Sequence, residues 1–446
     1  MAKYQKYAEY KDSGVEWLEQ VPKNWEIIKI KHLSSVKRGA SPRPIDDPKY
    51  FDDNGEYAWV RIADVSASDT YLLNTTQTMS DLGSSLSVKL EPNELFLSIA
   101  GTVGKPCINK IKACIHDGFV YFPDLKIPNK FLFYVFAGEQ AYKGLGKMGT
   151  QLNLNTDTVG DIKVALPKSI EDIQNIINFL DHETAKIDSL IAKQEKLIEL
   201  LKEKRQAVIS HAVTKGLNPD VAMKDSAVEW LGNVPEHWNV IKFNHCVQIR
   251  NGLVDPRHEN YKNLILYAPN HIDKGTGKIV YKETAEEQGA DSNKYLCFKG
   301  EVIYSKIRPA LAKVAICEED SALCSADMYP MDGFNGLSNK FLYYFILSDS
   351  FTEAVILDSD RVAMPKINRE SLSEYKLPIP PLEEQKRIID FIETTGWNLD
   401  KLEQQAQKAI QLMQERRIAL ISSAVTGKID VRNWQHPNEA KTELSP

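Results

Sequence analysis

A glycine-rich segment with a lysine, Gly101-Thr-Val-Gly104-Lys105, contains the residue types that could bind a phosphate group. In a phosphate-binding loop, backbone N–H groups and a lysine hold the phosphate oxygens, and a Ser or Thr follows the lysine. Here the glycines do not have that spacing, and Pro106 follows the lysine. The segment therefore predicts a turn between two strands and no nucleotide site.

The six cysteines and nine histidines are the residues that could ligate a metal ion or act in catalysis. The spacing Cys107-x6-Cys114 recurs as Cys317-x6-Cys324, and His116 lies beside the first pair. A zinc site needs four ligands at tighter spacing, and no histidine spacing indicates a catalytic triad. The Asn/Asp-Pro-Pro-Tyr/Phe stretch typical of amino-methyltransferases is also absent. We therefore expect no metal site, no catalytic residue and buried positions for the paired cysteines.

The composition limits the classes of protein that remain. A chain of 446 residues with 43% hydrophobic and 26% charged residues is expected to form more than one folded domain. It has no run of about 18 apolar residues and no secretory signal at its start, so we expect no membrane span. The scattered cysteines indicate a reducing, cytoplasmic compartment. A net charge of -6 excludes a simple basic coat protein for nucleic acid.

The chain contains two copies of one unit. Residues 11–33 and 224–246 are identical at 13 of 23 positions, including Trp17/Trp230 and Trp25/Trp238. "NKFL" recurs at 129 and 339, "INFLD" at 177 matches "IDFIE" at 389, and "KRQAVISHAVT" at 204 matches "RRIALISSAVT" at 416. The offsets are all 210 to 213 residues, which indicates two large repeats and excludes a solenoid of short ones.

Each copy ends in a long segment whose apolar residues alternate spacings of four and three, which predicts a long amphipathic helix. A helix of that length needs a partner to cover its apolar face, and the matching helix of the other copy is the economical candidate. Gly396 interrupts the second stripe. We expect the two stripes to pack together through Ile177, Leu180, Ile187, Ile191, Ile198, Leu201, Val208, Ile389, Ile392, Leu399, Ile410, Met413 and Leu420.

The order of elements predicts an α+β fold with two pseudo-repeated mixed domains. Short β-like runs such as 57–62, 94–99 and 301–305 are bounded by turn residues, and a helical segment follows them in each copy. If the second long helix packs antiparallel on the first, the two helices form a coiled-coil spacer that separates the domains. Such an arrangement suits the reading of two separated sites on a linear polymer such as DNA.

On these features the sequence resembles the specificity subunits of type I restriction–modification systems, and the resemblance covers nearly the whole chain. It rests on "DSGVEWLEQVPKNWEIIKIKHL" and its repeat, on the variable segments, and on the entry "LPIPPLEEQ" into a helix ending "RRIALISSAVTG". The first copy departs from the pattern, because it reads "VALPKSIED" at the helix entry. The expected parts are an N-terminal arm (1–22), a first target-recognition domain (23–168), a spacer helix (169–216), a linker with the repeated arm (217–235), a second target-recognition domain (236–380), a second spacer helix (381–428) and a tail (429–446).

The resemblance implies that each target-recognition domain reads one half of a split, asymmetric site on double-stranded DNA. It also implies that the helices dock two adenine methyltransferase (modification) subunits, and that motor/nuclease (restriction) subunits join the complex. S-adenosylmethionine, ATP and Mg would belong to those partners, so this chain would bind no cofactor and carry no catalysis. The alternatives are a coiled-coil protein-interaction scaffold without DNA readout, a nuclease or methyltransferase in its own right, and a DNA-recognition chain of a different multisubunit restriction system.

Base edges and phosphates are contacted mostly by Arg, Lys, Asn and Gln side chains and by small polar groups in loops. Three pairs of loops carry such residues at matching places in the two copies. The candidate DNA-binding residues are Lys37, Arg38, Arg43, Thr102, Lys105, Lys147 and Gln151 in the first copy, and Arg250, Asn251, Arg257, Lys306, Arg308, Lys313, Arg361 and Lys366 in the second. Because basic and acidic residues are nearly balanced in the first domain, we expect weak DNA binding by the isolated chain and tight binding with the methyltransferase subunits.

Overall fold

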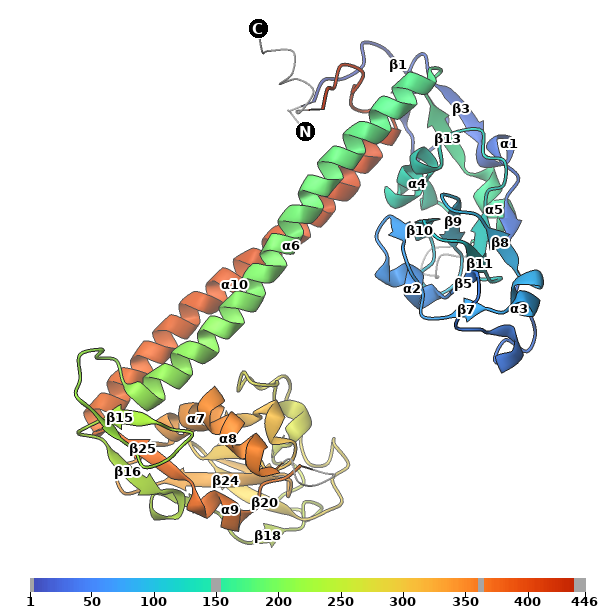
Figure 1. Cartoon of the computed structure of the whole chain (residues 1–446). Helices are drawn as coiled ribbons and strands as arrows, with labels where there is room; N and C mark the ends of the chain where they lie inside the picture. The colour runs from blue at the N-terminus through green and yellow to red at the C-terminus, as the bar shows by residue number, and fades with distance from the viewer. Residues whose placement is uncertain (1–3, 146–153, 360–364, 437–446) are drawn as a thin grey trace. The chain divides into compact units, whose positions relative to one another are not determined.

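The computed structural model describes residues 4–145, 154–359 and 365–436. Two compact units are present: Met1–Gln194 with Lys408–Pro446, and Glu195–Gln407 (Figure 1). Both long helices, α6 (Ile170–Lys215) and α10 (Leu382–Val425), pass from one unit into the other. The helices therefore do not form a unit of their own, because each end of the pair is packed into the core of a mixed domain.

Two sheets form the centre of the first domain. One has the order β4-β12-β9-β10-β6 and the other β7-β5-β11-β8. Apolar residues of both sheets, among them Phe96, Cys107 and Phe119, fill the core between them. The strands are β4 (Lys37–Arg38), β5 (Tyr57–Val60), β6 (Tyr71–Leu72), β7 (Thr78–Met79), β8 (Val88–Leu90), β9 (Leu95–Ser98), β10 (Pro106–Asn109), β11 (Ala113–Ile115) and β12 (Phe119–Tyr121).

The second domain repeats this arrangement with sheets of order β17-β24-β21-β22 and β18-β20-β23-β19. The correspondence extends to strand direction. The strand that carries Cys114 lies parallel to β5, and the strand that carries Cys324 lies parallel to β19. The strands are β17 (Val247–Ile249), β18 (Leu253–Val254), β19 (Leu266–Tyr267), β20 (Lys294–Phe298), β21 (Val302–Ser305), β22 (Val314–Ile316), β23 (Ser321–Cys324) and β24 (Met328–Gly333).

An apolar helix covers the outer face of the first-named sheet in each domain. In α4 (Asn129–Ala137) every residue from Phe131 to Phe136 is buried, and in α7 (Asn339–Leu347) Phe341, Leu342 and Phe345 are buried. These helices share a core with one end of the long helices. The further helices are α1 (Ile30–Leu33), α2 (Ile62–Ala67), α3 (Asp81–Ser85), α5 (Thr156–Asp161), α8 (Asp349–Ser359) and α9 (Arg369–Glu374).

The repeated segment, residues 11–33 and 224–246, packs against the end of a long helix in each unit. In the first unit, Pro22 and Trp25 lie against Gly427, just beyond α10, and in the second, Trp238 lies against Gly216, just beyond α6. Both tryptophans are fully buried. The arm strands are β1 (Tyr10–Asp12), β2 (Gln20–Pro22), β14 (Met223–Asp225) and β15 (Asn233–Pro235); beside them β3 (Glu26–Lys29) pairs with β13 (Lys163–Leu166), and β16 (Asn239–Lys242) with β25 (Lys376–Ile379).

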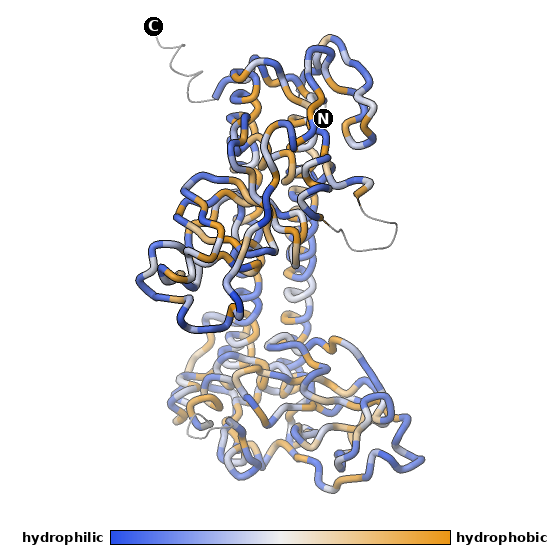
Figure 2. The backbone as a smooth tube through the Cα atoms, turned by 90° about the vertical axis from the view of Figure 1, so that its right-hand side faces the viewer, coloured by the Kyte–Doolittle hydropathy of each residue, from blue (hydrophilic) through white to orange (hydrophobic). Residues whose placement is uncertain are grey.

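Apolar and polar residues recur along both long helices (Figure 2). None of the thirteen predicted stripe residues is exposed. In the first unit Ile177, Leu180 and Ile187 share a core with Leu420. Among the described residues, no helix is long and apolar enough to cross a membrane.

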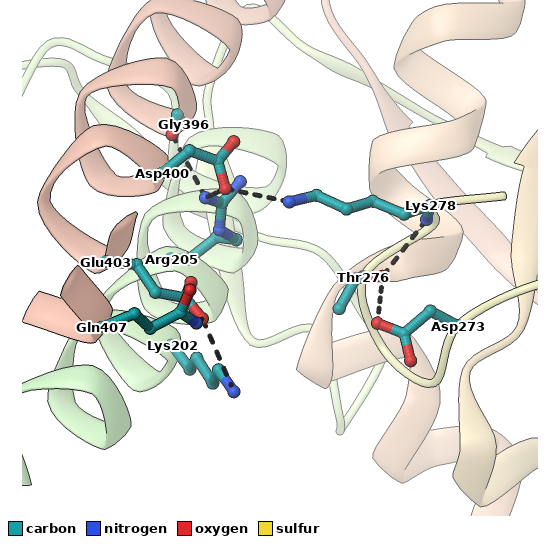
Figure 3. A network of polar contacts seen from close by, with 9 residues as sticks. All are labelled: Lys202, Arg205, Asp273, Thr276, Lys278, Gly396, Asp400, Glu403 and Gln407. Atoms are coloured by element: carbon teal, nitrogen blue, oxygen red, sulfur yellow. Dashed lines mark hydrogen bonds and ion pairs between the residues drawn. The ribbon is translucent and has the colours of Figure 1, made fainter. Parts of the chain in front are cut away.

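Ion pairs join the two long helices inside each unit. In the second unit Arg205 donates to Asp400 (2.6 Å), and Lys202 lies 3.7 Å from Glu403 (Figure 3). Residue numbers rise along α6 as they fall along α10, so the helices run antiparallel there.

The first unit contains the matching helix pair, Arg417 with Asp188 (2.8 Å). Arg205 and Arg417 occupy equivalent positions of the repeat, as do Asp188 and Asp400. Each unit therefore uses the same two repeat positions to join its helices, with the arginine supplied by a different copy.

Gly396, which interrupts the predicted stripe, contacts the guanidinium of Arg205 in this network. Arg205 donates to the Gly396 carbonyl oxygen (3.1 Å), and a Cβ at Gly396 would lie 3.2 Å from the guanidinium. The Asp400 carboxylate also accepts from Lys278 (2.9 Å) of the second domain (Figure 3). The interruption in the stripe thus makes room for a polar contact between the helices.

Candidate nucleic-acid interface

In the first domain, two predicted arginines converge on the turn between β11 and β12. Arg38 Nε donates to the Asp117 carbonyl oxygen (2.5 Å), and Arg43 donates to the Asp117 carboxylate (3.2 Å). The Arg43 side chain is 80% exposed, so its other donors face solvent. Lys37 is exposed beside them. Gly39 is required at this place, because a Cβ there would overlap the His116 carbonyl group.

Thr102 and Lys105 lie in the turn between β9 and β10. The structure therefore confirms the expected turn between strands. Lys105 donates to the carbonyl oxygen of Ser66 (2.8 Å), and the Thr102 and Ser66 hydroxyls are 2.6 Å apart. These bonds fasten the turn to α2 and use part of the hydrogen-bonding capacity of both side chains.

A groove of about 680 Å³ opens beside the Arg38–Arg43 cluster. Trp59, Arg61, Gln77 and His116 are among the residues that line it. Burial lowers the pKa of His116, and the nearby Asp117 opposes this shift. Since the His116 Nδ1 accepts from the Gly118 N–H group (2.9 Å), the neutral ring carries its proton on Nε2 and can donate from there. Sequence reasoning missed these lining residues.

In the second domain, Arg250 is engaged inside the protein. Its guanidinium binds the carboxylate of Glu301, which is 5% exposed, and lies 4.7 Å from the ring centre of Phe298. Arg257 pairs with Asp255, two residues away, through two bonds of 3.0 Å. Arg250 thus compensates a buried charge, whereas Arg257 lies 66% exposed on its own loop.

The structure brings together two further predicted segments of the second domain. Ile307 forms an isolated antiparallel bridge with Lys366, and the Arg308 N–H group donates to the Pro365 carbonyl oxygen (2.9 Å). Arg308 and Lys366 are both exposed. Lys306 lies 5.3 Å from the ring centre of Tyr329.

Lys313 points elsewhere, because its ammonium group donates to the Pro269 carbonyl oxygen. Lys147, Gln151 and Arg361 lie outside the described residues. Whether any of the candidate residues contacts DNA stays a prediction.

Arg369 is a residue of this region that the sequence reasoning missed. It is the first residue of α9 and contacts the loop that contains Arg250 and Asn251. The equivalent helix of the first copy is α5, and both helices have an asparagine as N-cap, Asn155 in α5 and Asn368 in α9. The next residue is Thr156 in the first copy and Arg369 in the second. Comparing the two copies position by position would have shown that a basic residue stands at this place in the second copy only.

The cysteines are buried in the domain cores, as expected. Burial raises the pKa of both Cys107 and Cys114 to about 12, so these thiols stay protonated at neutral pH. Within the described part of the chain, no group of three or more His, Cys, Asp or Glu side chains is placed to hold a metal ion.

Two related mixed domains, each with basic loops at the ends of its strands and each built onto a long helix, define a protein made of two copies of one recognition module. The chain belongs to the family described as type I restriction modification DNA specificity domain, whose model matches residues 22–200 and 235–412. Each match covers most of one copy of the repeat.

Relatives and solved structures agree with this assignment. The chain is 28% identical over 436 residues to the type I restriction enzyme EcoDI specificity subunit of Escherichia coli, covering 94% of this chain and 91% of the relative. It is 24% identical to the MjaVIII specificity subunit of Methanocaldococcus jannaschii, covering 93% and 95%.

The fold is similar to a chain from a study of the assembly and conformational transition of the type I R-M system (TM-score 0.66, 13% identity, 92% and 99% coverage). It is also similar to the HsdS subunit of Thermoanaerobacter tengcongensis (TM-score 0.50, 12% identity, 92% and 98% coverage).

Proposed function

We propose that this chain is the DNA sequence-specificity subunit of a type I restriction–modification complex and acts in the cytoplasm. Its two target-recognition domains each read one half of a split, asymmetric DNA site. The observation that carries the proposal is the double match of the specificity-domain family, once on each copy of the repeat. Relatives named as specificity subunits align along more than nine-tenths of the chain.

Divergence between the two domains supports an asymmetric site. At the end of the edge strand, Lys37-Arg38-Gly39 stands in one copy and Arg250-Asn251-Gly252 in the other. Their partners differ as well, since Arg38 binds the Asp117 backbone while Asn251 binds Arg369. Side chains that differ in length and in the number and geometry of their donors, such as Arg38 and Asn251, contact different base edges from one place in the fold.

The long helices are proposed to form an antiparallel coiled-coil spacer and to dock two adenine methyltransferase subunits. The matching Arg–Asp pairs of the two units support this arrangement. Exposed apolar side chains along the helices, such as Leu190, Leu197 and Trp397, are suited to burial against a protein partner.

Catalysis is assigned to the partner subunits. The sequence has no phosphate-binding loop and no amino-methyltransferase motif. S-adenosylmethionine would then be held by the methyltransferase subunits, and ATP and Mg by motor/nuclease subunits, with no cofactor on this chain.

The test is a genome-wide map of methylated adenine in cells with and without the gene. The expected result is a split, asymmetric motif that is methylated in the presence of this chain and unmethylated in its absence. An unchanged map in cells that express the methyltransferase would overturn the proposed function.

A further inference from the structure

Arg369 binds the loop that follows β17. Its guanidinium donates to the carbonyl oxygens of Arg250 (2.6 Å) and Ile249 (3.4 Å) and to Oδ1 of Asn251. Three acceptors on consecutive residues are thus bound by one rigid, planar donor group. The loop is fixed at the end of an edge strand and contains two of the candidate DNA-binding residues, Arg250 and Asn251.

Two aromatic rings keep Arg369 itself in place. The guanidinium carbon lies 5.7 Å from the ring centre of Tyr295 and 5.2 Å from that of Tyr329, and the Tyr295 hydroxyl is 3.4 Å from the guanidinium. Tyr329 is 5% exposed. Since the arginine is held by packing as well as by hydrogen bonds, it can impose one orientation on the residues it contacts.

The bond from Arg369 decides which way the Asn251 amide points. Arginine has only donors, so the Asn251 atom that faces it must be the oxygen. The Nδ2 group is then the free end of an exposed side chain, and the described residues provide no partner for it. Gly252 follows with a φ of +85° and no neighbouring atom within 4 Å of its Cβ position, so the loop is open on that side.

We infer that Arg369 is a positioning residue that holds the Asn251 oxygen and turns its Nδ2 donor outward, so that the second domain reads a hydrogen-bond acceptor at this place on the DNA. This inference rests on the proposed function and deepens it. An asparagine that pairs with adenine uses both its oxygen and its nitrogen. With the oxygen bound by Arg369, the Asn251 Nδ2 group instead matches a single acceptor atom, such as O6 or N7 of guanine, N7 of adenine, O4 of thymine or a phosphate oxygen.

The first domain presents the same polarity at the equivalent place. Arg38 precedes Gly39 as Asn251 precedes Gly252, and its guanidinium also offers only donors. In that domain the side chain supplies the donors directly, whereas in the second the pairing of Asn251 with Arg369 produces them. Both domains therefore present hydrogen-bond donors at the end of the edge strand.

Asn251→Asp is the most informative variant, because aspartate keeps the oxygen that Arg369 binds and loses the Nδ2 donors. We expect the complex with its methyltransferase subunits to methylate its motif about ten-fold less in a timed reaction, as for the loss of one base or phosphate contact. The melting temperature of the chain should not fall, since the Arg369 bond gains a full charge. Asn251→Ala, which removes the donors without adding charge, should show the same loss of methylation.

Asn239→Asp is the matched control, because Asn239 is exposed on β16 and the change adds the same charge to the same domain. It should methylate at the wild-type rate. If Asn251→Asp and Asn251→Ala also methylated the wild-type motif at the wild-type rate, the inferred donor contact would be wrong, although the proposed function would stand. If no methylation motif depended on the wild-type chain, both the inferred donor contact and the proposed function would be wrong.

Discussion

At the residue scale, the structure divides the candidate DNA-binding Lys and Arg residues into those that stabilise the fold and those whose charge is accessible to a ligand. Arg250 belongs to the first kind, because Glu301 is buried and depends on it. We expect Arg250→Met to lower the free energy of unfolding by about 2–4 kcal/mol, the cost of leaving a buried carboxylate without its ionic partner. Urea unfolding of the purified chain, followed by circular dichroism, measures this change.

Arg257→Met is the control for that experiment. The Arg257 side chain is 66% exposed and its partner Asp255 is 45% exposed, so the pair contributes little to stability. We expect a change within about 0.5 kcal/mol. If both variants were equally stable, Glu301 would have found another partner and the structural role of Arg250 would be refuted.

The position of basic residues in loops could be predicted from sequence, but their partners could not. Arg38 and Arg43 are candidates because Lys37-Arg38-Gly39 with Arg43 in the first copy matches Arg250-Asn251-Gly252 with Arg257 in the second. Asp117, to which both are bound, comes from a turn about 75 residues further on, and only the pairing of β4 with β12 brings it close. Arg369 was missed for the same reason, since it meets Asn251 only in the folded domain.

At the element scale, the repeated segment (residues 11–33 and 224–246) is explained by the helix end against which each copy packs. Gly427 has a φ of +70° and its Cβ position overlaps the ring of Pro22, whereas Gly216 has a φ of +78° and its nearest contact would be Trp238 at 3.3 Å. We expect Gly427→Ala to destabilise the chain by about 2–4 kcal/mol, from the left-handed backbone and the overlap together.

Gly216→Ala provides the matched comparison at the equivalent place in the second unit. It shares the backbone strain but not the severe overlap, so the expected cost is about 1–2 kcal/mol. Thermal unfolding of the two variants under one condition decides the order. A larger loss for Gly216→Ala would mean that the arm and the helix end are not packed as described.

The helix ion pairs give a second prediction at this scale. Asp400 accepts from both Arg205 and Lys278, and its side chain is 31% exposed. Among the described residues Asp188 forms its ion pair with Arg417 only, and it is 47% exposed. Asp400→Asn should therefore cost about 1–2 kcal/mol and Asp188→Asn less than about 1 kcal/mol. Urea midpoints at low and high salt measure both, and equal losses would contradict the shared role of Asp400.

The long helices are the elements that sequence reasoning placed best, because heptad spacing over forty residues is a strong periodic signal. The stripe residues, from Ile177 to Leu420, are all at least half-buried. Gly396 looked like a break in that pattern, and only its neighbour Arg205 explains it. The short strands, many of two to four residues, could not be bounded from sequence, since their order in each sheet depends on contacts between distant segments.

At the scale of the whole molecule, charge decides how the chain can meet DNA. With 55 Lys and Arg against 61 Asp and Glu, the chain as a whole is repelled by a polyanion. Several of its cations, among them Arg250, Arg257 and Lys282, are already paired with carboxylates. A cation paired with a carboxylate contributes less to the release of counterions from the duplex, and this release is the main source of sequence-independent affinity.

We therefore expect the isolated chain to bind a duplex containing its own motif weakly, with a Kd of about 10 μM or more at physiological salt, as for non-specific binding. Methyltransferase subunits that clamp the duplex should lower the Kd at least ~100-fold. They add phosphate contacts, while this chain fixes the position of the complex on the DNA sequence. Fluorescence anisotropy with and without those subunits, on the motif and on a duplex with one half-site scrambled, tests both statements. Equal affinity with and without the subunits would mean that the two domains alone supply the binding energy, and the acidic balance of the chain would then need another explanation.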